Sequence, residues 1–339
     1  VIDVYRRKME AVRKPLPFFV FISFFPQLVA GPIERATNLI PQFMENRRFS
    51  YRCGVDGMRL ILWGLFKKMV VADNAATVVN LVFADYQGVG TLNLWIGALL
   101  FSFQIYGDFS GYSDIAIGTA RLFGVKLMRN FHFPYFSRDI AEFWRRWHIS
   151  LNTWFVDYLY IPLGGSRRGK WRTVRNTMVV FLTSGLWHGA NLTFVAWGAW
   201  HAMLFVPLLL TGRNKRYLPS SAAGPVSFKE SLMMGLTFIL VVIGWVIFRA
   251  DNLHQAADYI RLMFSHYTPA AAVLGKSALL WSVLMLAAEW LSRDREAPTF
   301  LAPKGMLRYR AVRWTVYLVL FLVTLIFAGS QAEFIYFKF

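Results

Sequence analysis

The sequence predicts an all-α polytopic membrane protein. Of its 339 residues, 56% are hydrophobic and only 17% are charged, whereas a typical soluble protein carries about 25% charged residues. Several apolar runs approach the ~20 residues that an α-helix needs to cross a bilayer. No Pro/Ser-rich linker or internal repeat interrupts the pattern. We therefore expect residues 1–339 to form a single integral-membrane domain.

The charge balance supports a bilayer partner. The chain carries 37 Lys and Arg against 19 Asp and Glu, a net charge of +18. These basic residues lie mostly between apolar runs, which suits cytoplasmic loops and anionic headgroups and argues against a nucleic-acid partner. The only cysteine, Cys53, excludes an internal disulfide. The chain opens at Val1 without an initiator methionine, and we interpret it as lacking N-terminal spans.

The first third of the chain contains interrupted apolar segments. Residues 16–33 are broken by prolines, which predicts a bent or re-entrant helix. Residues 58–83 contain Lys67 and Lys68, so we expect this segment to lie partly in the membrane interface. Next we expect a span over residues 92–109 and a separate short buried helix over residues 110–123.

The remaining spans are clearer and give a partial topology. They are expected at residues 174–186, 192–210, 232–248, 271–291 and 314–328. The basic loops at 166–175, 213–216 and 293–313 are expected in the cytoplasm. The hairpin between the first two loops therefore turns near His188, away from the cytoplasm.

His188 is the first candidate catalytic residue. It follows Trp187 in a short turn between two apolar runs, where a histidine normally needs a partner or water. Imidazole is also the side chain best suited to move a proton near neutral pH. Gly185 and Gly189 flank it and allow close approach of backbone or substrate. The alternative is a packed histidine at a helix break.

His148 is the second candidate, at the end of residues 142–150, which are dense in charge and tryptophan. On a continuous helix, Trp144 would be the i, i+4 neighbour of His148, and Glu142 that of Arg146. Two interpretations of the segment remain open: an interfacial anchor of Trp and snorkelling Arg, or the lining of a polar channel.

The other polar residues favour structural roles. His201 follows small residues on the next apolar run, and we interpret it as structural. The six histidines show no metal-ligand spacing, so no metal site is expected. Three acidic residues could pair with the Arg145–Arg146 cluster, and each is interpreted as structural: Asp108, Asp114 and Asp157.

A glycine-rich basic loop is the candidate for donor binding. Arg167 and Arg168 follow two glycines at residues 164–165, and arginine suits phosphate groups. A phosphate-bearing acyl donor such as a coenzyme A thioester could dock there. A loop that contacts lipid headgroups explains the same residues.

These segments together resemble the membrane-bound O-acyltransferases, in particular the bacterial polysaccharide O-acetylases of the alginate type. The matching motifs are FFPQLVAGPI at 24–33, GDFSGYSD at 107–114, EFWRRWHISL at 142–151, LWHGAN at 186–191 and EFIYFKF at 333–339. The resemblance implies a multi-helix bundle with short or re-entrant helices around a central funnel or tunnel, in a multi-pass protein of the bacterial inner membrane.

The resemblance also implies the roles of the site residues. His188 would be the essential family histidine and His148 a second polar residue on the tunnel, beside Trp144, Trp187 and Asn191. Acetyl-CoA would be the acyl donor, with no bound cofactor. The acceptor would be an exported polysaccharide or a periplasmic acetyl-relay protein. Two alternatives remain: D-alanyl transfer to teichoic acid, and a glycan transporter without enzymatic activity.

Overall fold

The computed structural model describes residues 1–218, 226–267, 272–293, 301, 305–328 and 334. The described elements are helical. In the N-terminal half they are α1 (Ile2–Tyr5), α2 (Pro15–Ser23), α3 (Phe25–Leu28), α4 (Ala36–Met44), α5 (Tyr51–Leu65), η1 (Phe66–Ala72), α6 (Asp73–Ala84) and α7 (Thr91–Leu122). The break between α2 and α3 confirms the bent helix expected over residues 16–33.

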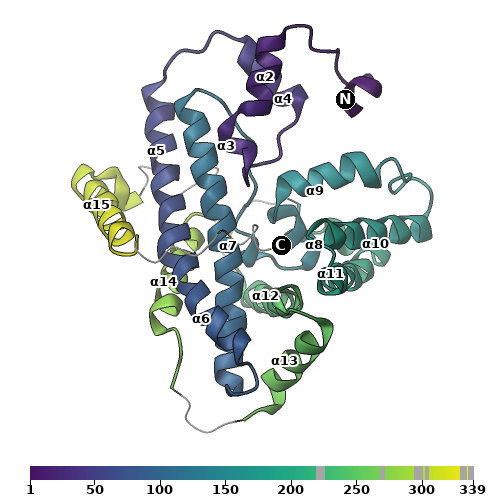
Figure 1. Ribbon diagram of the computed structural model, residues 1–339, viewed down its shortest axis with the longest axis vertical. Helices are drawn as coiled ribbons and strands as arrows, with labels where there is room; N and C mark the ends of the chain where they lie inside the picture. Colours follow the sequence, from purple (N-terminus) through teal and green to yellow (C-terminus); the bar gives the residue numbers. More distant parts are fainter. Residues whose placement is uncertain (219–225, 268–271, 294–300, 302–304, 329–333, 335–339) are drawn as a thin grey trace.

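The second half continues with short connecting helices and longer apolar ones. These are η2 (Pro134–Phe136), α8 (Ile140–Arg146), α9 (Ile149–Phe155), η3 (Val156–Tyr160), α10 (Lys170–Trp187), α11 (Leu192–Leu210), η4 (Arg213–Lys215), α12 (Phe228–Arg249), α13 (Leu253–Ser265), α14 (Lys276–Trp290), η5 (Gly305–Arg308) and α15 (Arg310–Ile326). In Figure 1, α5 and α7 run side by side along the long axis, with α15 on one side and α8 to α11 on the other.

The described residues include two helices that are long and apolar enough to cross a membrane. They are α11, with 19 residues, and α12, with 22 residues. Both coincide with spans expected from the sequence. Helices α14 and α15 occupy the positions of two further expected spans, but with 15 and 17 residues they are shorter.

The α7 helix differs from the expectation. The sequence suggested a span over residues 92–109 and a separate short helix after it, whereas the structure has one helix of 32 residues. Polar residues had suggested the break, but Asp108, Ser110 and Ser113 are buried against neighbouring helices. Because these neighbours form polar contacts with the three side chains, the helix continues through them without a break.

Glycines bring α5 and α7 into close contact. A Cβ atom added at Gly57 would lie 2.6 Å from the Gly118 carbonyl oxygen, and one added at Gly64 would lie 2.5 Å from the Gly111 oxygen. Each helix places its two glycines seven residues apart, so they share one face. Without side chains there, the two backbones approach as small-residue interfaces in membranes do.

We expect Gly111→Ala to destabilise the protein. The new Cβ would lie 2.7 Å from the Gly64 oxygen, which is backbone and cannot move alone, so overpacking should cost about 1–3 kcal/mol. The measurement is the free energy of unfolding in detergent. Gly235→Ala on α12 is the matched control, since its Cβ would meet nothing within 4 Å. Equal stability of the two variants would contradict the close contact.

The two lysines of η1 point into the protein, Lys67 buried and Lys68 half-buried, and both form ion pairs. Lys67 is only 3% exposed and its ammonium lies 2.7 Å from Asp114. Lys68 lies 2.9 Å from Asp73 and 2.8 Å from Asp108. Asp108 and Asp114, interpreted as structural with a possible pairing to the arginines of residues 145–146, pair instead with these lysines of η1. The pairs reduce the cost of burying these charges.

Candidate active site

The hairpin of α10 and α11 positions His188. A Cβ at Gly185 would lie 2.3 Å from the Phe194 oxygen, and one at Gly198 2.4 Å from the Phe181 oxygen. The two helices therefore pack backbone to backbone near their common turn. His188 caps α10 at this turn, followed by Gly189 with φ of 148°. A non-glycine residue would be strained there.

The His188 side chain is 8% exposed and lies among aromatic rings. Its ring centroid is 5.1 Å from that of Trp187, 5.3 Å from that of Trp197 and 5.1 Å from that of Phe248. Rings on three sides hold the imidazole in one place. Such a fixed, water-poor position suits a group that must meet a substrate in one geometry.

His148 lies in the same region, but its backbone conformation differs from the one that the sequence predicted. Helix α8 ends at Arg146, Trp147 is extended, and His148 adopts the left-handed conformation at φ 43° and ψ 54°. The expected helical spacing between Trp144 and His148 was therefore wrong. A non-glycine residue in this region costs on the order of 1–3 kcal/mol and is found mainly at functional sites.

A hydrogen bond indicates the tautomer of His148. Its Nδ1 accepts from the backbone N–H of Leu151 at 3.4 Å. With Nδ1 used as an acceptor, the neutral ring carries its proton on Nε2. The Nε2–H can then donate a hydrogen bond, which is the property required to stabilise a developing oxyanion.

The structure brings the two candidate histidines together. Trp187 lies between them, with its ring centroid 6.4 Å from that of His148 and 5.1 Å from that of His188. Trp187 itself is 51% exposed, so it covers the pair from outside.

Trp144 lies away from this pair. Its ring contacts those of Trp197 and His201, at 5.6 and 5.0 Å, and it is 9% exposed. His201 is fully buried, and its ring nitrogens have no hydrogen-bond partner among the described residues. The Trp144 and His201 rings pack inside the helix bundle.

A polar cavity of about 480 Å³ lies next to the His188 turn. It is lined by Asn80, Gln104, Gly189, Ala190, Asn191, Phe194, Phe248, Arg249, Ala250 and Asp251. The Asn191 side chain caps α11 by accepting from Thr193 N–H and donates to the Asp251 oxygen. His188 is not among the lining residues, but Phe194 and Phe248 line the cavity and also contact its ring.

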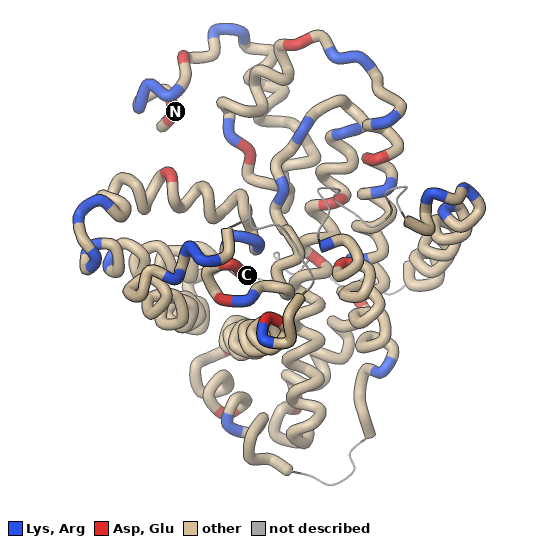
Figure 2. The backbone as a smooth tube through the Cα atoms, turned by 180° about the vertical axis from the view of Figure 1, so that it is seen from behind, with Lys and Arg blue, Asp and Glu red and all other residues tan. Residues whose placement is uncertain are grey.

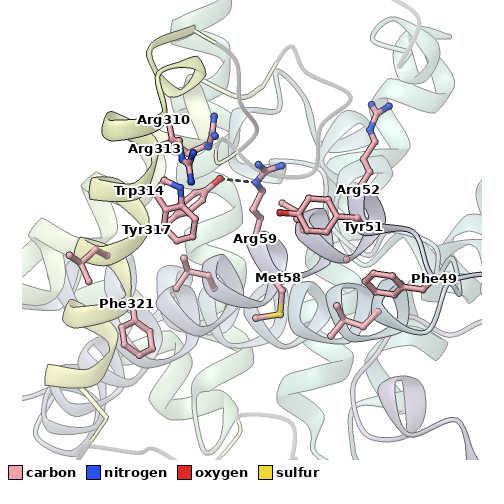
Figure 3. Close-up of a pocket in the computed structure, with 15 residues that line it drawn as sticks. Phe49, Tyr51, Arg52, Met58, Arg59, Arg310, Arg313, Trp314, Tyr317 and Phe321 are labelled. Atoms are coloured by element: carbon pink, nitrogen blue, oxygen red, sulfur yellow. Dashed lines mark hydrogen bonds between the residues drawn. The ribbon is translucent and has the colours of Figure 1, made fainter.

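A larger groove of about 1120 Å³ lies between α5 and α15, lined by residues of other helices than those that carry the histidines. Its arginines gather at one end and apolar side chains such as Met58 and Phe321 at the other (Figure 3). Arg59 donates to the Tyr317 hydroxyl at 2.7 Å across the groove. None of the candidate site residues lines this groove, so it is separate from the candidate active site.

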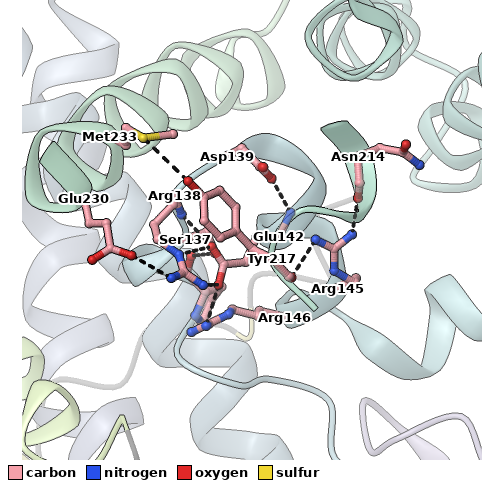
Figure 4. A network of polar contacts seen from close by, with 11 residues as sticks. Ser137, Arg138, Asp139, Glu142, Arg145, Arg146, Asn214, Tyr217, Glu230 and Met233 are labelled. Atoms are coloured by element: carbon pink, nitrogen blue, oxygen red, sulfur yellow. Dashed lines mark hydrogen bonds and ion pairs between the residues drawn. The ribbon is translucent and has the colours of Figure 1, made fainter. Parts of the chain in front are cut away.

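An ionic network holds α8 in place (Figure 4). It lies at the start of α12, the end of that helix that is far from the His188 turn. Glu142 lies 2.6 Å from Arg146 and 3.0 Å from Arg138, and Arg138 lies 2.9 Å from Glu230 at the start of α12. The Glu142–Arg146 pair was expected from the spacing. Arg145 instead donates to the backbone oxygens of residues 214 and 217. Asp157, the third acidic residue considered as a possible partner of these arginines, pairs with Arg35.

The basic loop before α10 is folded back along that helix. The Asn176 side chain donates to the backbone oxygens of Leu163 and Gly165. Arg167 and Arg168 are exposed on this loop. At 1.5 Å per residue, the eleven residues from Asn176 to Trp187 span about 17 Å. Figure 2 shows basic residues in this loop and in the segment after α11.

Comparison with known proteins gives the family. Residues 12–227 match the membrane-bound O-acyltransferase family. The chain is 46% identical over 265 residues, 78% of its length, to the probable alginate O-acetylase AlgI of Pseudomonas syringae pv. tomato, of which it covers 49%. It is 39% identical over 250 residues to the peptidoglycan O-acetyltransferase of Helicobacter pylori, with 73% of this chain and 46% of the relative covered.

A more distant relative is the teichoic acid D-alanyltransferase of Bacillus subtilis, which is 30% identical over 254 residues, 69% of this chain and 61% of that protein. The chain spans about half the length of the alginate and peptidoglycan relatives. It belongs to the membrane-bound O-acyltransferase family, as the motifs around His148 and His188 indicated.

Sequence reasoning missed the polar residues of the cavity beside His188. Gln104, Asn80 and Arg249 come from α7, α6 and the end of α12, and no motif connects them. One signal was present: Gln104 interrupts an apolar run with a side chain that is costly at membrane depth.

Proposed function

We propose that the protein transfers an acetyl group from a cytoplasmic thioester to a hydroxyl on the other side of the bacterial cytoplasmic membrane, for O-acetylation of an exported polysaccharide. The observation that carries the proposal is the meeting of His188 and His148 around Trp187, within a chain of this acyltransferase family. The identity to O-acetylases supports acetyl as the group.

His188 and His148 would supply the two groups that the transfer needs, a base and a hydrogen-bond donor. The acceptor oxygen attacks the thioester carbonyl while His188 takes the hydroxyl proton as general base. The Nε2–H of His148 donates to the oxygen that gains negative charge. The C–S bond then breaks, and the proton passes from His188 to the leaving thiolate. General-base catalysis typically accelerates a reaction by ~10²–10⁴-fold, and one hydrogen-bond donor to the oxyanion accelerates it by about 10²–10³-fold.

The arrangement of the helices separates donor and acceptor. Arg167 and Arg168 are proposed to hold the donor phosphates at the basic end of α10, and an extended acyl-carrying arm would cover the ~17 Å to Trp187. Basic loops favour the cytoplasmic side, so the turn at residues 188–191 faces the acceptor. The proposed partners are the bilayer, acetyl-CoA and a periplasmic protein that relays the acetyl group or modifies the polysaccharide.

The test compares acyl donors. Full-length purified protein is incubated with labelled acetyl-CoA or with a D-alanyl thioester of a carrier protein, and release of free thiol is measured. We expect thiol release from acetyl-CoA. Release from the D-alanyl thioester alone would favour the teichoic acid branch. Release from neither, with an acceptor present, would contradict an acyltransferase.

A further inference from the structure

The polar cavity beside the His188 turn contains one side chain with an unmet hydrogen bond. Gln104 is 6% exposed and lines the cavity. Its side-chain oxygen is buried and has no hydrogen-bond partner among the described residues. Buried polar groups are normally paired, and an unpaired one lowers stability. Residues that violate this rule are expected at functional sites.

The rest of the lining shows what kind of ligand would pair with Gln104. Amide, guanidinium and carboxylate groups surround the cavity, from Asn80, Arg249 and Asp251. Arg249 donates to the Asn80 oxygen at 3.1 Å and lies 3.9 Å from Asp251, whose side chain is 76% exposed, so its charge is only partly balanced. Such a lining offers donors and acceptors for several hydroxyls, and the Arg249 guanidinium can pair with a carboxylate; a uronate sugar unit carries both kinds of group.

Apolar surface completes the lining. Phe194 and Phe248 contact each other at 4.9 Å between ring centroids and form one wall. Apolar faces together with a few placed polar groups are typical of small-ligand sites, and about 480 Å³ falls within their ~300–1,000 Å³ range. A sugar unit presents both kinds of surface, polar at its hydroxyls and apolar at its C–H groups.

The cavity is also correctly placed for an acceptor. Phe194 and Phe248 lie between it and the His188 ring, with centroids 6.3 and 5.1 Å from that ring. A ligand in the cavity is therefore one aromatic ring away from the imidazole. The network around Glu230 lies at the other end of α12, nineteen residues or about 29 Å from Arg249.

We propose that this cavity binds one sugar unit of the acceptor polysaccharide, and that Gln104 is a positioning residue whose side-chain oxygen accepts a hydrogen bond from a sugar hydroxyl. The inference rests on the proposed function, which it deepens by assigning the acceptor site. No bond is formed or broken at Gln104. Its role is to hold the sugar next to the His188 turn, with a neighbouring hydroxyl directed toward the Phe194 and Phe248 rings that separate the cavity from His188.

The test uses Gln104→Met, which keeps the length of the side chain and removes its amide. The full-length protein is purified in detergent, and an alginate oligosaccharide serves as the acceptor probe. We expect its Kd and its KM to rise about tenfold, while the KM for acetyl-CoA does not change. The melting temperature of the free protein should increase, because an unmet buried hydrogen bond has been removed. Gln87→Met is the control, since Gln87 is exposed and outside the cavity.

The outcomes separate this inference from the proposed function. If wild-type protein binds the oligosaccharide and Gln104→Met weakens binding, the assignment of the cavity as a sugar site is supported even if no acetyl transfer is detected. A lower melting temperature with unchanged oligosaccharide binding would show a structural role and overturn the inference. Absence of oligosaccharide binding by wild-type protein would overturn it as well.

Discussion

Replacement of His188 is expected to abolish acetyl transfer while the protein still inserts into the membrane. The proposed general base, which lies between Trp187 and Phe248, is lost, so the rate should fall by ~10²–10⁴ or more. The assay is the acetyl content of the exported polysaccharide, measured beside the amount of enzyme in the membrane.

Two variants separate chemistry from packing at this position. His188→Ala leaves a cavity among the three surrounding rings and carries a stability cost. His188→Asn retains a polar side chain and more of the volume but cannot act as a base near neutral pH. Loss of activity in both, with normal amounts of the asparagine variant, supports catalysis. Normal acetylation by either variant would remove His188 from the mechanism.

Lys67→Met is expected to have the largest effect on stability. The substitution leaves Asp114 without its cation, 2.7 Å away in the native protein, at a position where the aspartate side chain is only 17% exposed. Removing one partner of such a pair costs about 3–5 kcal/mol. The free energy of unfolding in detergent, or the yield of folded protein, measures the loss.

A double variant and a surface control test the cause. Lys67→Met combined with Asp114→Leu removes both charges, so it should recover much of the loss. Arg261→Met breaks a pair with Asp258 in which the arginine is 69% exposed, and it should cost less than about 1 kcal/mol. Equal losses for Lys67→Met and Arg261→Met would contradict the buried ionic network.

The sequence predicted the parts of the fold that depend on local pattern. The α11 and α12 spans follow from length and hydropathy, and the turn at His188 follows from its glycines and flanking apolar runs. The sequence did not predict that Lys67 and Asp114 meet. That contact joins residues 47 positions apart, and its only local signal is a charge inside an apolar segment.

The candidate site shows the same division. His188 was identified from its surroundings in the chain, and His148 from the density of polar residues near it. The geometry at His148 depends on a helix that ends at Arg146 and a residue with positive φ, which no spacing rule anticipates. The residues around Gln104 come from separate helices, so only the folded chain brings them together.

Transport of the acetyl group across a membrane is the most direct test of the account. Full-length protein is reconstituted in vesicles with an alginate oligosaccharide inside, and labelled acetyl-CoA is added outside. We expect label bound to the oligosaccharide in the lumen for wild-type protein and background levels for His188→Asn. Label that remains on coenzyme A outside, or equal lumenal label for the two proteins, would contradict His188-dependent acetyl transfer.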